Sequence, residues 1–281
     1  MTSSKSFDAL LVKKVTNGML SIDVYNEINL AAQKIEKGAT ILEIGTYHGA
    51  TTISLALGLD KNNKIISIDK FYCTPNKFGT LEENKAIVEN NFKYFDVEKN
   101  IDFYLGTSNE VSLKLPKELT LSMLVIDADG AIDRDFELFY NKLLPGSPII
   151  IDDYSDIVRI QYKKKYTRID QKFRLTHMLI SFMEQEKLLE KHKVIDSTYF
   201  GIKPICQDKD IDFSNYDFRQ IYRKLNSADA QLPSLISRIK IKIVEYISQF
   251  ALKLSPTLYN HCRKIYKKFK IKKEINLTNK T

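Results

Sequence analysis

The chain has 281 residues, 43% of them hydrophobic, which predicts one domain of roughly 200 residues with a substantial core, plus an appendage. Its net charge of +8 comes from the C-terminal end, because residues 231–281 carry 12 Lys and Arg against 2 Asp and Glu. The rest is nearly neutral, which argues against nucleic-acid binding over the whole surface and leaves the tail as the segment to meet an anionic partner.

The sequence carries no signal for export and none for a membrane span. Its three cysteines, Cys73, Cys206 and Cys262, lie far apart without metal-ligand spacing, as expected in a reducing compartment. The N-terminus has no apolar signal core, and no apolar run reaches about 18 residues. We therefore expect a cytoplasmic protein.

The first predicted elements are a helix over residues 21–37, a strand over 39–44, and a second helix after a turn that contains Gly45 and Gly49. Glycine lets a ligand approach the backbone closely, and the helix start offers unpaired N–H groups. The turn therefore predicts a nucleotide-type site, although similar turns also occur in α/β domains that bind no ligand.

Carboxylates mark the ends of the first two predicted strands. Glu43 lies where the first strand meets the turn, and it suits a ligand with an ammonium group or hydroxyls better than one with phosphates. The second strand, residues 64–69, ends in Asp69. Its distance in sequence from Glu43 is close to the one at which an acidic residue binds a ribose diol in nucleotide-binding folds. The alternative is that Asp69 is a solvated aspartate in a loop.

A helix over residues 79–95 and a strand over 101–105 come next, followed by a turn at Gly106 and an apolar face at Val111, Leu113 and Leu115. The polar residues of this turn suit the edge of a heterocycle or, equally well, a helix cap. They are Thr107, Ser108 and Asn109.

Two further strands, over residues 119–126 and 148–151, end in pairs of acids. A helix through Phe136 and Phe139 separates them. Adjacent parallel strands bring their C-terminal ends together, so the acids are expected to converge, and a divalent ion such as Mg²⁺ would relieve their repulsion. The alternative is one helix cap and several solvated carboxylates. The predicted ligands are Asp127, Asp152 and Asp153.

The remainder of the body predicts a polar loop over the site from residue 159 to 167, a long helix containing His177, and a closing strand pair over residues 193–202. The domain is expected to span residues 21–204, after an N-terminal segment over 1–20. A linker over 205–230 and a basic helical extension over 231–281 complete the predicted organisation.

In combination, these motifs resemble the class I S-adenosylmethionine-dependent methyltransferases. The resemblance covers about residues 20–203 and is to the small metal-dependent O-methyltransferases of the catechol and macrolide-sugar type. It rests on Glu43-Ile-Gly45-x-x-x-Gly49, the acid at the end of the second strand, Gly106-Thr-Ser108, Val-Ile-Asp127-x-Asp129, and Leu-Pro-Gly-x-x-Ile-Ile-Ile-Asp152-Asp153.

The resemblance implies a Rossmann-like sheet of seven mainly parallel strands with helices on both faces, an S-adenosylmethionine cofactor, and a hydroxyl acceptor on a small molecule or sugar. Asp69 would hold the ribose, the turn after the third strand would flank the adenine, and the acid cluster would bind Mg²⁺, with Asp127 also beside the cofactor. The methionine part would face Glu43, Gly45, Thr46, Tyr47 and Gly49.

One position departs from these relatives, which commonly carry a His or Lys general base at the position that matches Gly130. Loss of a general base slows a reaction by roughly 10²–10⁴-fold. Asp129, His48 and His177 are the candidates to replace it. Otherwise the chain would be a degenerate methyltransferase that binds cofactor as a partner or regulatory subunit.

The tail predicts two basic amphipathic helices within residues 231–273, interrupted at Pro256. They suit packing on the body or on a second copy in a homodimer, contact with the inner surface of the membrane, or binding to RNA. A tRNA or rRNA methyltransferase is disfavoured by the near-neutral body and by the absence of an Asn/Asp-Pro-Pro-Tyr/Phe segment.

Overall fold

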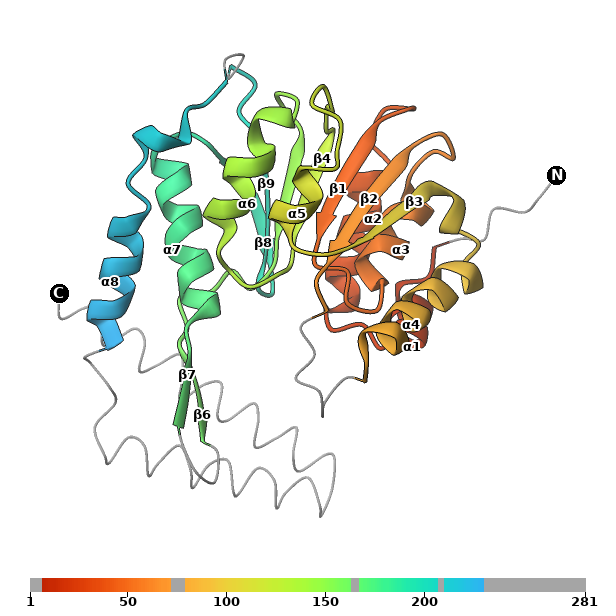
Figure 1. Cartoon of the computed structure of the whole chain (residues 1–281), viewed down its shortest axis with the longest axis horizontal. Coiled ribbons are helices and arrows are strands. Elements are labelled where there is room, and N and C mark those ends of the chain that lie inside the picture. The colour runs from red at the N-terminus through yellow and green to blue at the C-terminus, as the bar shows by residue number, and fades with distance from the viewer. Residues whose placement is uncertain (1–6, 72–78, 163–166, 207–209, 230–281) are drawn as a thin grey trace. The chain divides into compact units, whose positions relative to one another are not determined.

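The computed structural model describes residues 7–71, 79–162, 167–206 and 210–229 (Figure 1). The chain divides into two units, residues 1–225 and residues 226–281. The two predicted basic helices lie outside the described residues. Within the described ranges, every helix is too short or too polar to cross a lipid bilayer.

The first unit is built on a seven-stranded sheet with the order β3-β2-β1-β4-β5-β9-β8. The first five of these strands are parallel, and β9 runs antiparallel to both of its neighbours. This is the Rossmann-like topology that the sequence predicts. The strands are β1 Thr40–Ile44, β2 Lys64–Asp69, β3 Ile101–Leu105, β4 Met123–Ile126, β5 Pro148–Ile151, β8 Glu190–Ile195 and β9 Thr198–Ile202.

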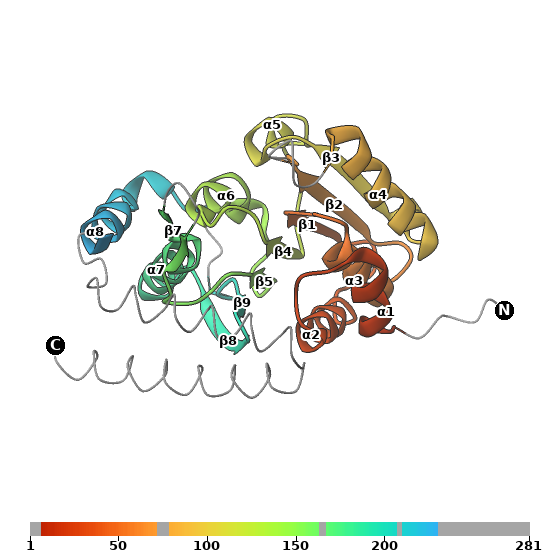
Figure 2. The ribbon, with the colours of Figure 1, turned by 90° about the horizontal axis from the view of Figure 1, so that it is seen from below.

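Helices cover both faces of the sheet, as the end-on view in Figure 2 shows. On one face lie α1 Ala9–Thr16, α2 Ile22–Ala32, α3 Ala50–Gly58 and α4 Leu81–Tyr94. On the other face lie α5 Ser108–Ser112, α6 Ile132–Phe139 and α7 Lys172–Gln185. Short 3₁₀ helices occupy Glu98–Asn100, Tyr140–Lys142 and Phe213–Asn215.

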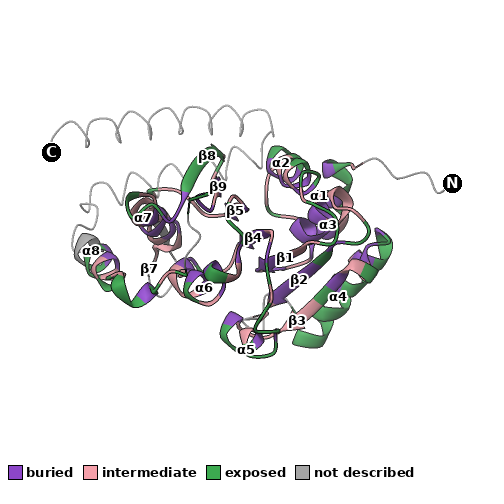
Figure 3. Ribbon diagram, turned by 90° about the horizontal axis from the view of Figure 1, so that it is seen from above, coloured by how far each residue is buried: buried purple, intermediate pink, exposed green. Residues whose placement is uncertain are grey.

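The central strands are buried on both faces because consecutive side chains alternate between two apolar cores (Figure 3). In β1, Ile41 packs under the α1–α4 layer, whereas Leu42 packs under the α5–α7 layer. This explains why β4 and β5 are continuous apolar runs in the sequence, and why β1 is apolar apart from Thr40 and the buried Glu43. The buried sheet holds the ends of these strands in a fixed arrangement, and the candidate site lies there.

Several predicted element boundaries need correction. The segment 1–20 contains α1, which Asp8 caps at its start and left-handed Asn17 ends. Helix α2 ends at Ala32 instead of continuing to residue 37, because the next backbone hydrogen bonds join residues three apart, as in a 3₁₀ turn. Strand β4 starts at Met123, four residues later than predicted.

The predicted loop from residue 159 to 167 is wrong as well. This segment begins with β6 Arg159–Tyr162, which pairs antiparallel with β7 Thr167–Asp170 in a two-stranded sheet of its own. Arg159-Ile-Gln-Tyr162 does alternate polar and apolar residues, but the alternation covers only four residues beside a run rich in Lys and Tyr, so it was not recognised as a strand.

Residues 205–230 also differ from the prediction, which was a linker. They contain a 3₁₀ turn and α8 Arg219–Asp229, and the side chains of Phe213, Ile221 and Leu225 are buried. The Tyr222 hydroxyl donates a hydrogen bond to Asp133 Oδ1 on α6, 2.8 Å away. This segment therefore extends the core of the first unit.

Candidate functional site

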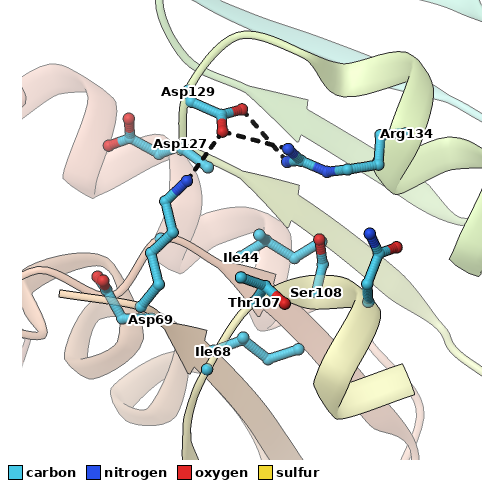
Figure 4. A pocket seen from close by; sticks show the side chains of 13 residues that line it. Ile44, Ile68, Asp69, Thr107, Ser108, Asp127, Asp129 and Arg134 are labelled. Atoms are coloured by element: carbon cyan, nitrogen blue, oxygen red, sulfur yellow. Dashed lines mark hydrogen bonds and ion pairs between the residues drawn. The ribbon is translucent and has the colours of Figure 1, made fainter. Parts of the chain in front are cut away.

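The main candidate site is a cavity of about 290 Å³ at the C-terminal ends of β1, β2 and β4, of the size used for small ligands (Figure 4). Such crevices are the usual ligand sites of open parallel sheets. Its lining comprises Ile44, Gly45, Ile68, Asp69, Lys70, Gly106, Thr107, Ser108, Asn109, Asp127, Ala128, Asp129 and Arg134.

The turn between β1 and α3 requires glycine at two positions. Gly45 has a φ of +101°, and a Cβ there would lie 1.9 Å from the carbonyl oxygen of Asp127. Gly49 has a φ of +85° at the N-cap of α3, and a Cβ there would lie 2.6 Å from the ring of Phe92. The two glycines therefore let the turn fit between β4 and α4.

Asp69 holds this turn from the end of β2. Its Oδ2 atom accepts the Tyr47 backbone N–H and its Oδ1 atom accepts the Phe71 N–H, each at 2.7 Å. Tyr47 itself has a left-handed φ of +48°. The half-buried Asp69 carboxylate also lines the cavity, where a polar ligand can reach it, as the sequence predicts.

Glu43 differs from its predicted place, because its side chain is fully buried and does not belong to the cavity lining. Its Oε2 atom accepts hydrogen bonds from Thr52 Oγ1 at 2.5 Å and Ser67 Oγ at 2.6 Å. Thr46 Oγ1 lies 2.6 Å from the same Ser67 hydroxyl. Burial raises the pKa of the Glu43 carboxyl to about 7, and its Oε1 atom has no hydrogen-bond partner among the described residues.

The turn after β3 caps a helix, as one alternative predicts, and also lines the cavity, where contact with a heterocycle stays a prediction. Thr107 is the N-cap of α5, and its hydroxyl accepts the Glu110 N–H. The Ser108 hydroxyl donates to Asp135 Oδ1 at 2.6 Å. Asn109 lines the cavity wall. Leu113, predicted on the apolar face, is 88% exposed because α5 ends before it.

Asp129 closes one side of the cavity between two cations (Figure 4). Its carboxylate accepts bonds from Lys70 Nζ at 3.0 Å and from both terminal nitrogens of Arg134 at 3.2 Å. Although burial opposes it, these bonds hold the pKa of Asp129 well below its usual range. Such a carboxylate is a weak proton acceptor, which argues against Asp129 as the replacement base.

The predicted acid cluster is present. Asp127, Asp152 and Asp153 place one carboxylate oxygen each within 4.8 Å of one another. Lys172, at the start of α7, places its ammonium among them, bonded to Asp153 Oδ2 and 3.7 Å from Asp127 Oδ1. Burial, followed by the charge of Asp152, raises the pKa of Asp127 to about 7.

Neither candidate histidine joins this cluster or lines the main cavity. The His48 ring stacks on Tyr47, with centroids 3.9 Å apart, and its backbone oxygen accepts a bond from Asn91. His177 lies beside Tyr154 and lines another cavity of about 360 Å³ together with Arg174.

Comparisons with known proteins agree with this geometry. Residues 42–154 match a family model described as a methyltransferase domain. Over these residues, which are less than half of its length, the chain is similar to the methyltransferase family. The resemblance to S-adenosylmethionine-dependent methyltransferases that the sequence predicts agrees with this match. No curated protein matches the chain.

Two solved structures show the extent of the shared methyltransferase fold. The O-methyltransferase TomG from Streptomyces achromogenes, solved with S-adenosylmethionine, has 14% identity and a TM-score of 0.53, over 72% of this chain and 92% of TomG. An O-methyltransferase from Bacillus cereus, solved with S-adenosylhomocysteine, has 19% identity and a TM-score of 0.51, over 69% and 89% of the two chains.

Sequence reasoning missed three cations at the candidate site and its acid cluster: Lys70, Arg134 and Lys172. Lys70 directly follows the predicted ribose-binding acid, so its position alone could have indicated it. Lys172 lies 42 residues after Gly130 in the sequence, and only the packing of α7 brings them together. No motif in the sequence signals that contact.

Proposed function

We propose that this methyltransferase transfers the methyl group of S-adenosylmethionine to a hydroxyl oxygen of a small molecule or sugar. The observation that carries the proposal is the cavity over β1, β2 and β4, with Asp69 and the glycine turn on its wall. The two neighbours described above support the donor and the oxygen acceptor, because both are O-methyltransferases solved with this cofactor or its demethylated product.

The residues of the cavity fit this donor. Asp69 offers carboxylate oxygens that can accept bonds from ribose hydroxyls, while its bonds to the turn keep it in place. The turn after β3 offers Thr107 and Asn109 to the edge of the adenine. Asp127 adds negative charge at the β4 end, which suits a cationic ligand. When bound, S-adenosylmethionine supplies an electrophilic methyl group on its sulfonium.

The acid cluster of Asp127, Asp152 and Asp153 has one feature that favours the predicted divalent metal and another that argues against it. The spacing of the three carboxylates suits a hard cation with oxygen ligands. However, Lys172 already places a positive charge on Asp127 and Asp153, and Thr198 Oγ1 donates to Asp152 Oδ1 at 2.6 Å. With these donors in place, the residues do not fit a resident divalent ion, and the proposed methyl transfer uses none.

A degenerate methyltransferase that binds cofactor without turnover is the second candidate. The observation that favours it is the absence of a side chain at Gly130, together with the placement of Asp129, His48 and His177 described above. The two candidates share cofactor binding and differ only in the transfer step.

Isothermal titration of the full chain with S-adenosylmethionine tests what both candidates share. We expect saturable binding that Asp69→Ala weakens by at least about tenfold, because the ribose hydroxyls lose their acceptor. Asp60→Ala is the control, since this half-buried carboxylate after α3 pairs with Lys37 outside the cavity. Equal binding by wild type and Asp69→Ala would remove Asp69 from the site.

Turnover against a panel of hydroxylated acceptors then separates the two candidates. Formation of S-adenosylhomocysteine only when an acceptor is present supports the O-methyltransferase. Tight cofactor binding without turnover on any sugar, phenol or aliphatic alcohol of the panel supports the degenerate candidate instead.

A further inference from the structure

Lys172 contacts the acid cluster from a separate element, the first turn of α7. Its Nζ atom bonds to Asp153 Oδ2 and lies 3.7 Å from Asp127 Oδ1. Its side chain is 26% exposed, and those of the two aspartates are 14% and 24% exposed, so solvent screens these charges only partly. The ammonium therefore neutralises part of the charge of the cluster.

The position of Lys172 depends on the absence of a side chain at residue 130. A Cβ on Gly130 would lie 2.9 Å from Lys172 Cγ and 3.1 Å from the Lys172 carbonyl oxygen. The backbone of Gly130 is left-handed, with a φ of +86°. The aliphatic part of Lys172 thus packs into the space that a larger residue at 130 would fill, which directs its ammonium to the aspartates.

Each carboxylate of the cluster has a donor from the chain itself. Lys172 serves Asp127 and Asp153, and the Thr198 hydroxyl on β9 serves Asp152. The two other cations near β4, Lys70 and Arg134, are bonded to Asp129, which is not a member of the cluster. Lys172 is therefore the cation that the described part of the chain directs into the cluster.

We propose that Lys172 is the resident cation of the Asp127–Asp152–Asp153 cluster and takes the place of a divalent metal ion there. A metal ion and the ammonium need the same carboxylate oxygens and repel each other at contact distance. The cluster of the wild type is therefore closed to divalent ions while Lys172 is charged and in place. This inference concerns the apo protein and does not depend on the proposed acceptor.

Mn²⁺ binding, followed by electron paramagnetic resonance of the free ion, tests the proposal on the full chain. We expect wild type to leave the free Mn²⁺ signal unchanged. Lys172→Met keeps the length of the side chain and removes its charge, so the cluster should bind Mn²⁺ at least about tenfold more tightly. Arg174→Met is the matched control, because it removes a cation from the same helix that pairs with Asp156 outside the cluster.

If Lys172→Met does not fold, wild type and Asp153→Asn still test the proposal. The proposal would be overturned if wild type binds Mn²⁺ and Asp153→Asn abolishes that binding. A folded Lys172→Met that binds no more Mn²⁺ than wild type would overturn it too. Titration of the same samples with S-adenosylmethionine reports separately on the proposed function, because failure of cofactor binding leaves the Mn²⁺ result valid.

Discussion

Glu43 and Lys172 show that a residue's match to a sequence motif does not decide where its side chain lies. Glu43 follows the expected motif, yet it lies beneath the cavity wall, where it accepts the hydroxyls of Thr52 and Ser67. Lys172 follows no motif, yet its ammonium bonds to the acid cluster. The sequence could place the acids at strand ends, because strands are recognised locally. It could not show which side chains point into the cavity, because packing of distant helices decides that.

The buried Glu43 carboxyl predicts a pH-dependent stability. Its pKa rises from 4.5 to about 7 on folding, so the native state binds more protons than the unfolded state in this range. Stability should therefore fall as pH rises from about 4.5 to 7, by about 3 kcal/mol from this group. Glu43→Gln should lose this contribution. Urea unfolding of both proteins at about pH 5 and about pH 8 measures it; equal pH dependence would contradict the shift.

The glycines of the chain differ in what they require, and Gly45 is the most constrained. Gly45→Ala should destabilise the protein by more than about 3 kcal/mol, because its Cβ would collide with the Asp127 carbonyl in a left-handed backbone. Gly38→Ala is the matched control. Gly38 also has a positive φ, but nothing lies within 4 Å of its Cβ position, so we expect a loss of about 1 kcal/mol. Similar midpoints in urea for the two variants would refute the steric argument.

At the scale of elements, local patterns predicted the sheet well where strands are buried on both faces. Strand β2 is buried along most of its length, and it begins and ends where the sequence predicts because turn residues bound its apolar run. The less buried edge strand β3 also has the predicted bounds. The hairpin of β6 and β7 was missed because its residues are mostly polar. The segment after residue 204 was missed although Phe218, Ile221, Tyr222 and Leu225 recur at helical spacing, which matches α8.

That last segment predicts a measurable contribution to stability. The Phe213 ring is 8% exposed and packs edge-on against Tyr140, with centroids 5.6 Å apart. Phe213→Ala should cost about 3 kcal/mol, because it leaves a cavity in the core beside α6. Leu113→Ala, at an exposed site on the same face, should change stability by less than about 0.5 kcal/mol. Thermal unfolding of both variants checks the difference, and an equally small effect of Phe213→Ala would support a linker.

For the whole molecule, the lining of the main cavity is separate in sequence from the basic tail. Every residue that lines the main cavity falls between Ile44 and Arg134, inside the first unit. The tail accounts for the net positive charge of the chain, with 12 Lys and Arg against 2 Asp and Glu, and its predicted helices fall outside the described residues. Composition could assign the tail a charge but no partner, because amphipathic helices of this kind suit a membrane surface and a protein surface equally well.

This separation predicts that removal of residues 230–281 leaves cofactor binding intact. The truncated chain keeps α8 and the aromatic core around Phe213, so it should fold. Its Kd for S-adenosylmethionine should stay within about twofold of the full chain, and saturating cofactor should raise both melting temperatures equally, since the ligand stabilises only the folded state. Calorimetric titration and thermal unfolding measure the two effects. A truncated chain that folds, judged by circular dichroism, but no longer binds would show that the tail completes the site, and the first unit would then be an incomplete methyltransferase.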